Sequence, residues 1–156
     1  MQRLDNRTPL GFYFRLLSKK YAGVLTLRLA DLEIDRYYFY LLIIYQNDRM
    51  TQQELADYLK IDKAFAMKIV NYLSEHGLLE RRQNPSDKRK HLLAVTPEGE
   101  KLLPLIEKEM HNLNREAMAG LNQDQIAAFY TVLQKMWCNM YNMPEEELEL
   151  YFKLYK

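Results

Sequence analysis

The sequence has little of what disulfide-linked, disordered or membrane-spanning proteins require. It contains a single cysteine, Cys138, which rules out a disulfide within the chain and is typical of a reducing compartment. Five glycines and five prolines in 156 residues are too few for long linkers or low-complexity segments. The longest apolar run without a charge, residues 37–45, is about half of the roughly 20 residues that a helix needs to cross a bilayer. Because Asp5, Arg7 and Arg15 interrupt the start of the chain, no signal peptide is expected, and the predicted location is the cytoplasm.

Motifs of catalysis and metal binding are also missing. The sequence has no glycine-rich phosphate loop, no nucleophile elbow and no catalytic pair of carboxylates. His111 lies four residues after Glu107, but no third ligand follows at a spacing typical of metal sites, which favours a surface pair. Cys138 neighbours Trp137 in a helical segment, so we expect it to be buried. The sequence therefore predicts neither an enzyme nor a cofactor or metal site.

The chain has almost no net charge, but its charges are unevenly distributed. The formal net charge is +1 at neutral pH. From Lys60 to His91 there are eight Lys and Arg against four Asp and Glu, whereas residues 142–156 hold four Glu and two Lys. A polyanionic partner would therefore meet the middle of the chain.

The first third of the chain predicts two helices. Thr8 can cap a helix whose first residue is Pro9 and which extends to about residue 30. A second helical segment opens at Asp35 and ends at residues 47–48. Its apolar face is expected to hold three residues at helical spacing: Phe39, Leu42 and Ile43.

A capping box begins the middle of the chain. In Thr51-Gln-Gln-Glu54 the threonine oxygen can accept from the amide three residues on while the glutamate reaches back, which predicts a short helix over about 52–59. After a tight turn, Asp62 can cap a longer helix that Gly77 ends. The buried positions of this longer helix are expected to be Phe65 or Ala66, then Ile69, Val70 and Leu73.

A hairpin and two further helices follow. Residues 78–83 and 91–95 have the composition of strands, and the turn formers at 84–87 favour a reversal. Thr96 and Pro97 start a helix that is expected to reach about residue 119, and Asn122 caps a last helix that Pro144 ends. The predicted fold class is mainly α with a small β-hairpin wing (α+β). A winged helix-turn-helix DNA-binding domain at residues 35–96 is flanked by helical dimerisation regions at 1–34 and 97–156.

The order of helix, turn, longer helix and hairpin points to DNA, because an α-helix fits the major groove of B-DNA, which is about 12 Å wide. On the helix after Asp62, the residues expected to point outward are Lys63, Ala64, Met67, Lys68 and Asn71. The lysines can neutralise phosphates or donate to guanine, Asn71 can bond adenine, and the apolar pair can touch thymine methyl groups. Thr51 and Gln52 lie at a helix N-terminus that favours a phosphate, although capping alone explains them equally well.

Five segments in the middle of the chain together form a recognisable pattern. They are Thr51-Gln-Gln-Glu-Leu-Ala56, Ile61-Asp-Lys-Ala64, Leu73-Ser-Glu-His-Gly-Leu-Leu-Glu-Arg81, Pro85-Ser-Asp-Lys-Arg89 and Leu93-Ala-Val-Thr-Pro-Glu-Gly99. These segments resemble the MarR (multiple antibiotic resistance) family of transcription regulators. The resemblance covers about 50 residues, and its most specific part is the wing and the helix entry after it. The sequence departs from many relatives at residues 64–67, where Ala-Phe-Ala-Met replaces small hydroxyl residues.

The resemblance implies specific roles in the wing. Arg89 would enter or border a minor groove, whose negative potential attracts arginine where the groove is narrow. Asp87 would orient the basic side chains at the wing base, and Lys88 and Lys90 would contact phosphates.

The resemblance also implies a homodimer formed by interlaced helices from both chain ends. Two-fold symmetry would place the recognition helices about 34 Å apart and predicts a pseudo-palindromic operator in double-stranded DNA. The apolar residues assigned to this dimer interface are Phe12, Leu16, Trp137, Met140, Tyr141, Leu148 and Phe152. The alternative is that these residues form a core within one chain.

Family members commonly release DNA when a small aromatic or lipophilic compound enters a crevice beside the winged domain. The region that would line this crevice is rich in tyrosine, which suits a phenolic or fatty effector. The alternative is that the rings are packing residues with hydroxyls at the surface. The tyrosines assigned to the crevice are Tyr13, Tyr37, Tyr38 and Tyr40.

Two functions therefore compete. The first is a sequence-specific, DNA-binding repressor that a ligand relieves. The second is a winged-helix module that binds a protein through Phe65 and Met67 without specific DNA binding. Replacing Lys63, Lys68 and Arg89 by alanine would abolish DNA binding under the first and spare partner binding under the second.

Overall fold

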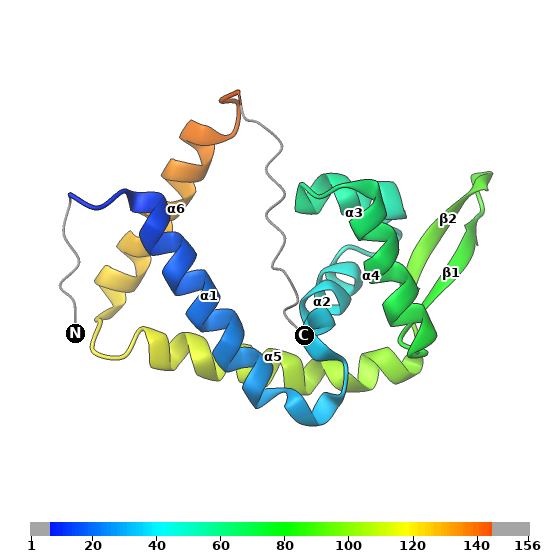
Figure 1. Ribbon diagram of the computed structural model, residues 1–156, viewed down its shortest axis with the longest axis horizontal. Helices are drawn as coiled ribbons and strands as arrows, with labels where there is room; N and C mark the ends of the chain where they lie inside the picture. Colours follow the sequence, from blue (N-terminus) through cyan, green and yellow to red (C-terminus); the bar gives the residue numbers. More distant parts are fainter. Residues whose placement is uncertain (1–6, 145–156) are drawn as a thin grey trace. The chain divides into compact units, whose positions relative to one another are not determined.

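A computed structural model describes residues 7–144. The α-helices are α1 (Leu10–Arg28), α2 (Tyr38–Gln46), α3 (Gln52–Leu59), α4 (Lys63–Glu75), α5 (Pro97–Ala117) and α6 (Gln123–Met140). Two short 3-10 helices (Ala30–Leu32 and Asp35–Tyr37) precede α2, and strands β1 (Leu79–Asn84) and β2 (Asp87–Val95) lie between α4 and α5 (Figure 1). The chain divides into two compact units between Leu113 and Asn114. The predicted fold class, mainly helical with one hairpin, is confirmed.

Local capping sets three of the helix starts, as predicted. The Thr51 hydroxyl accepts from the Glu54 amide at 3.2 Å, and the Thr51 amide donates to Glu54 Oε2 at 2.7 Å, which completes the capping box of α3. Asp62 Oδ1 accepts from the Phe65 amide at 2.7 Å at the start of α4. Asn122 caps α6 through the amide of Gln125 at 2.9 Å. These caps satisfy amides that a helix leaves without partners in its first turn.

The first two helices begin differently from the sequence prediction. Pro9 is the N-cap of α1, with an extended ψ of 132°, and no side chain caps that helix, so the role predicted for Thr8 is wrong. Asp35 opens a 3-10 turn, and α2 begins only at Tyr38. Phe39 is 44% exposed, because the buried side of α2 is centred on Leu41 and Ile44. The prediction that Phe39 faces the core was therefore wrong, whereas Leu42 and Ile43 are buried as expected.

The core of the first unit forms between α2, α3, α4 and α5. Its largest fully buried side chains include Leu41, Ile44, Leu55, Ile69 and Ile106. On α4 the buried position is Ala66, which is fully buried, while Phe65 stays partly exposed, so the choice between the two is settled. Such a core holds α3 and α4 as a rigid pair, because interiors are close-packed.

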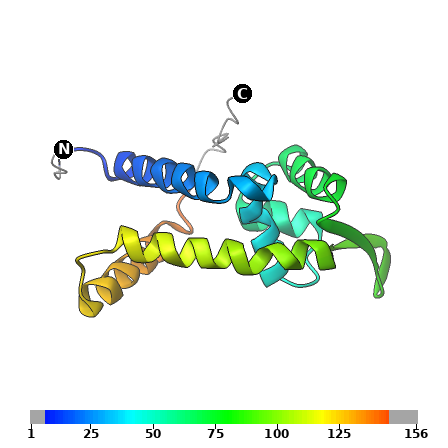
Figure 2. The same cartoon turned by 90° about the horizontal axis from the view of Figure 1, so that it is seen from below.

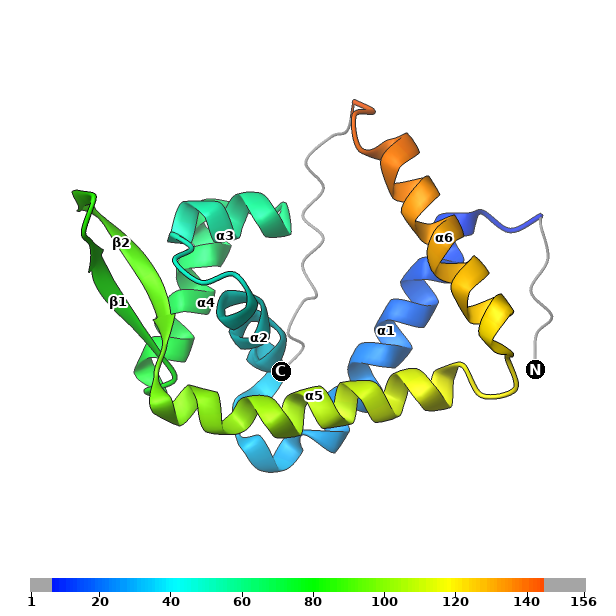
Figure 3. The ribbon, with the colours of Figure 1, turned by 180° about the vertical axis from the view of Figure 1, so that it is seen from behind.

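The hairpin projects from these helices (Figure 2). β1 and β2 pair antiparallel from Leu79↔Val95 to Asn84↔Asp87, so the turn is only Pro85 and Ser86 and β2 is longer than predicted. At its base, β2 forms a bridge to the segment before α3: the Leu93 amide donates to the Met50 carbonyl at 2.7 Å. From behind, the hairpin lies beside α4, and α5 continues from its base (Figure 3).

A tight junction joins the hairpin to α5. The Thr96 hydroxyl donates to the Gly77 carbonyl at 2.7 Å and accepts from the Gly99 amide at 3.1 Å. Gly77 ends α4 with a φ of +69°, which glycine adopts without strain. At Gly99 a Cβ would lie 2.5 Å from the Leu78 carbonyl oxygen, so only glycine fits there without a backbone shift.

The second unit is described by itself. None of the residues of α6 is buried. Cys138 is exposed, with its sulfur 3.3 Å from Gln134 Nε2, so the prediction of structural burial is wrong: the helix offers no core for it. Leu148 and Phe152 lie outside the described residues. Between residues 7 and 144, no helix combines the length and the apolar character that crossing a membrane requires.

Candidate nucleic-acid interface

The outward face of α4 carries the residues that the sequence assigned to DNA. Asp62 starts the helix, and burial of Ala66, Ile69 and Val70 turns the opposite side outward. The residues on that side are all exposed except Asn71, which is half-buried: Lys63, Ala64, Met67, Lys68 and Asn71. A face with two cations, two apolar side chains and one amide can meet phosphates and base edges.

Phe65 does not lie wholly on this outward face, because its ring also contacts α2. Its ring meets Tyr40 of α2 edge-on, with the centroids 6.2 Å apart. Met67 is 50% exposed. The apolar surface that α4 offers outward is therefore carried mainly by Met67 and Ala64.

The wing holds one arginine in place by its backbone and leaves its head group in solvent. Asp87 Oδ1 accepts from the Arg89 amide at 3.1 Å and from Arg89 Nε at 3.4 Å. The side chain of Asp87 is 31% exposed, whereas that of Arg89 is 93% exposed. Gln83 Nε2 donates to the Lys88 carbonyl at 3.1 Å across the hairpin, and the side chains of Lys88 and Lys90 are exposed. The wing thus presents three adjacent cations near its turn.

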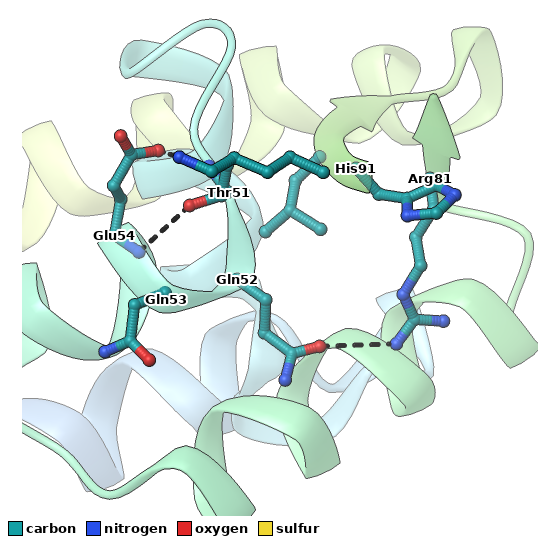
Figure 4. A pocket seen from close by; sticks show the side chains of 8 residues that line it. Thr51, Gln52, Gln53, Glu54, Arg81 and His91 are labelled. Atoms are coloured by element: carbon teal, nitrogen blue, oxygen red, sulfur yellow. Dashed lines mark hydrogen bonds between the residues drawn. The ribbon is translucent and has the colours of Figure 1, made fainter. Parts of the chain in front are cut away.

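An open depression of about 420 Å³ lies between the N-terminus of α3 and the two strands (Figure 4). Thr51 and Gln52 line it, so the structure places these predicted residues beside the wing rather than apart from it. The remaining lining residues are Gln53, Glu54, Arg81, Lys90, His91 and Leu93. Two cationic side chains, Arg81 and Lys90, therefore lie beside a helix N-terminus, an arrangement that favours an anion.

Arg81 is a site residue that the sequence analysis did not assign. Its Nη2 donates to Asn71 Oδ1 at 2.8 Å and to Gln52 Oε1 at 3.5 Å, which links β1 to α4 and α3. On the other face of β1, Glu80 and Arg82 pair with each other, Arg82 Nε donating to Glu80 Oε1 at 2.7 Å. Because successive side chains of a strand point to opposite faces, the sequence alone could have assigned Arg81 to one face of β1 and Glu80 and Arg82 to the other.

Glu54 brings a negative charge to the edge of the depression. The Thr51 amide that donates to its carboxylate is the main reason that its pKa lies below the ordinary value, and the positive charge of Lys90 acts in the same direction. The carboxylate is therefore ionised at neutral pH. The Thr51 hydroxyl already accepts from the Glu54 amide, so capping accounts for Thr51 as the sequence alternative proposed.

The tyrosines assigned to a ligand crevice lie in different surroundings. Tyr37 and Tyr38 are buried, and Tyr37 stacks on Tyr72 of α4 with the centroids 3.8 Å apart. The Tyr38 hydroxyl lies 3.3 Å from Thr26 Oγ1 of α1. Tyr40 is half-buried, and its burial, followed by the neighbouring tyrosines, raises its pKa. Tyr37 and Tyr40 thus belong to one aromatic cluster beside α4, whereas Tyr38 contacts α1 and Tyr13 lies on α1 against Phe12.

The residues assigned to dimerisation expose much apolar surface. On α1, Phe12 is 50% and Leu16 46% exposed. On α6 and just after it, Trp137, Met140 and Tyr141 are 57%, 60% and 61% exposed.

The isolated histidine on α5 has a backbone partner. His111 Nδ1 lies 2.9 Å from the Glu107 carbonyl oxygen, one helical turn earlier. Within residues 7–144, His, Cys, Asp and Glu side chains form no group of three that could hold a metal ion.

Comparison with known proteins matches the middle of the chain to a family model. Residues 36–91 match the model of the MarR family. The HTH-type transcriptional regulator YybA of Bacillus subtilis (strain 168), itself uncharacterized, is 23% identical over 126 residues, which span 80% of this chain and 84% of that protein.

Two solved structures share the fold over most of the chain. A MarR-family transcriptional regulator from Listeria monocytogenes, complexed with 26mer DNA, is 26% identical with a TM-score of 0.79, covering 85% of this chain and 89% of that one. A mutant MarR from E. coli, complexed with operator DNA, is 26% identical with a TM-score of 0.75, covering 86% of this chain and 99% of that one. Residues 36–91, which hold the helix-turn-helix and most of the hairpin, therefore match the MarR family model, and the chain is similar to transcriptional regulators over most of its length.

Proposed function

We propose that the protein is a homodimeric repressor that binds a pseudo-palindromic site in double-stranded DNA. The observation that carries the proposal is the set of exposed cations on α4 and in the wing. Lys63 and Lys68 are exposed on α4, and Arg89 is anchored by Asp87 yet 93% exposed. An anchored backbone with an exposed guanidinium suits insertion into a groove, because little conformational freedom of the wing is lost on binding.

The related structures support DNA as the partner. The Listeria monocytogenes regulator was crystallised with 26mer DNA, and the E. coli MarR mutant with operator DNA. By similarity, residues 35–96 would bind DNA in the cytoplasm, where a bacterial genome lies. Lys88 and Lys90 would contact phosphates on either side of Arg89, as would the helix N-terminus at Thr51 and Gln52.

Dimerisation and effector binding are the finer parts of the proposal. The half-exposed apolar residues of α1 and α6 would be covered by a second copy, which makes residues 1–34 and 97–156 the dimerisation regions. A small aromatic or lipophilic compound would relieve repression if it binds the form that does not bind DNA better than the form that does. We assign its contacts to Tyr37, Tyr38 and Tyr40, together with Tyr13 on α1.

Selection from random DNA, followed by footprinting, tests the proposal. We expect one enriched sequence with two-fold symmetry and protection of both half-sites. Replacing Lys63, Lys68 and Arg89 together by alanine should lower affinity at least about 100-fold and flatten the dependence on salt, because each lost phosphate contact removes about 0.9 from the slope of log K against log salt.

A charge-matched control separates interface from bulk charge. The control replaces three exposed lysines of α5 and α6 by alanine: Lys101, Lys108 and Lys135. Its affinity for DNA should stay within about threefold of the wild type. Absence of any enriched sequence would reject the proposal. The interaction module would be favoured instead if the chain captures a partner protein, if the first triple variant still binds that partner, and if the Met67→Ala variant does not.

A further inference from the structure

Arg81 sits at the centre of the surface where α3, α4 and β1 meet. One guanidinium nitrogen donates to two amide oxygens, Asn71 Oδ1 at 2.8 Å and Gln52 Oε1 at 3.5 Å. Figure 4 shows the Arg81 head group pointing toward Gln52 across the depression. The three residues come from three different elements, 10 and 29 positions apart in sequence.

The chemistry of arginine fixes which way these amides point. A guanidinium has only N–H donors, so a side-chain amide beside it must turn its oxygen inward. A hydrogen bond from a charged donor is shorter and roughly twice as strong as one between neutral groups. Asn71 and Gln52 therefore direct their NH₂ groups away from Arg81 and present donors to the surroundings.

This orientation changes what Asn71 can recognise. A bidentate contact to adenine needs the amide oxygen to accept from N6 and the amide NH₂ to donate to N7. With its oxygen held toward Arg81, Asn71 turns its NH₂ donors outward. These suit base edges whose acceptors have no donor beside them on the same base, N7 and O6 of guanine or O4 of thymine, whereas N7 of adenine lies beside the N6 donor. The adenine contact expected from the sequence would require the hydrogen bond between Arg81 and Asn71 to break.

We propose that Arg81 is a positioning residue that restricts Asn71 to donating hydrogen bonds and so sets the base preference at one position of each half-site. The inference rests on the proposed DNA-binding function. Arg81 acts here through Asn71 and not by its own contact to a base. Its charge on the strand is incidental to that role, because Arg82, the next residue, carries the same charge but pairs with Glu80 on the opposite face.

Base selection with four variants tests this role. Arg81→Met removes the donor while keeping the length of the side chain, and Asn71→Ala removes the amide. The double variant R81M/N71A measures their coupling. Arg82→Met is the matched control, since it removes one charge from the same strand.

The expected results are specific. The wild type should prefer guanine or thymine at the position that Asn71 contacts, and R81M should shift that preference toward adenine by about fivefold or more, which is the lower bound for one bidentate pair. N71A and the double variant should show the same loss of preference at that position. R82M should leave the preference unchanged.

A second substitution guards against a local folding defect in R81M. Arg81→Lys keeps the charge but cannot hold two amide oxygens in the planar geometry of a guanidinium. It should shift the preference in the same direction as R81M while leaving the salt dependence of binding unchanged.

Other outcomes would overturn the inference and leave the proposed function standing. If R81M lowers affinity for all sequences alike and reduces the salt slope by about one, Arg81 contacts a phosphate. If R81M and R81K keep the wild-type preference, Asn71 is not positioned by Arg81. If the wild type enriches no DNA sequence at all, the proposed function fails first, and this inference fails with it.

Discussion

The junction between the hairpin and α5 predicts a large effect of a very small substitution, Gly99→Ala. A Cβ at this position would lie 2.5 Å from the Leu78 carbonyl oxygen and 2.7 Å from Val95 Cγ1. The valine side chain could turn away. The carbonyl cannot move as easily, because it accepts from the Thr96 amide at 3.1 Å at the base of the hairpin. Relief of the clash therefore has to open the junction.

The magnitude follows from two opposed effects. Alanine is favoured over glycine inside a helix by about 1 kcal/mol, and Gly99 is the third residue of α5. Overpacking a close-packed site costs typically about 1–3 kcal/mol and sometimes more. Since the clash here is with backbone at a distance that real contacts do not show, the upper part of that range applies. We expect Gly99→Ala to lower the free energy of unfolding by about 1–2 kcal/mol.

Gly23→Ala is a matched control with the opposite sign. Gly23 lies within α1, and a Cβ there would meet no atom within 4 Å. Only the helix propensity remains, so the substitution should stabilise the protein by about 0.5–1 kcal/mol. Urea unfolding followed by circular dichroism measures both, with the slope of the transition unchanged. A G99A variant as stable as the wild type would refute the packing argument.

Three further outcomes are expected in and beside the candidate interface. Asp87→Ala releases the backbone and head group of Arg89, so DNA affinity should fall several-fold in a binding titration, while the melting temperature changes little because Arg89 is exposed; an unchanged affinity would mean that the anchoring is unimportant. Asp62→Ala removes the cap of α4 and should cost about 1 kcal/mol in urea unfolding, whereas Asp62→Asn, which still caps, should cost much less; equal losses would point to charge instead of capping. The pKa of Glu54 is lower in the folded protein than its ordinary value of 4.5, so its contribution to stability is complete above that value and is lost as the pH falls through the lowered pKa. Glu54→Gln should remove this part of the pH dependence, and an unaltered profile between about pH 3 and pH 6 would contradict the assignment.

The sequence predicted those features that depend on residues close together in the chain. The capping box of Thr51 and Glu54 and the cap of Asp62 each involve residues three positions apart, and the helix bounds of α3 and the start of α4 followed from them. Periodicity also found Ile69, Val70 and Leu73, because one side of α4 alone is buried.

The sequence failed where tertiary contacts decide. Phe39 and Leu42 are three residues apart and were expected on the same buried face of α2. The most deeply buried residues of α2 are Leu41 and Ile44, and Phe39 lies on the side that remains exposed. Cys138 looked like a buried thiol, but α6 has no buried residue in its own unit. The contacts of Arg81 join residues from three elements, and a single sequence carries no direct sign of such pairings.

Four residues of the wing and of the helix entry after it, Asp87, Arg89, Thr96 and Gly99, differ in what they contact. Thr96 bridges Gly77 and Gly99, and Gly99 itself makes room for the Leu78 carbonyl. Asp87 binds the backbone of the wing. Arg89 differs from these three, since its head group stands in solvent. Three of these four residues thus fix the junction between α4, the hairpin and α5 and the backbone of the wing. This structural role does not depend on the sequence of the bound DNA.

Base preference must then come from side chains other than these. On the described surface these are the outward residues of α4, where Ala64 and Met67 can make only apolar contacts and the orientation of Asn71 is set by Arg81. Relatives that keep the wing and the Thr96–Gly99 junction but differ at these positions would hold DNA in the same pose and select different operators. Exchanging residues 64, 67, 71 and 81 together between two such relatives should exchange their operators, whereas exchanging only residues 84–90 of the wing should alter affinity and salt dependence but not the selected sequence.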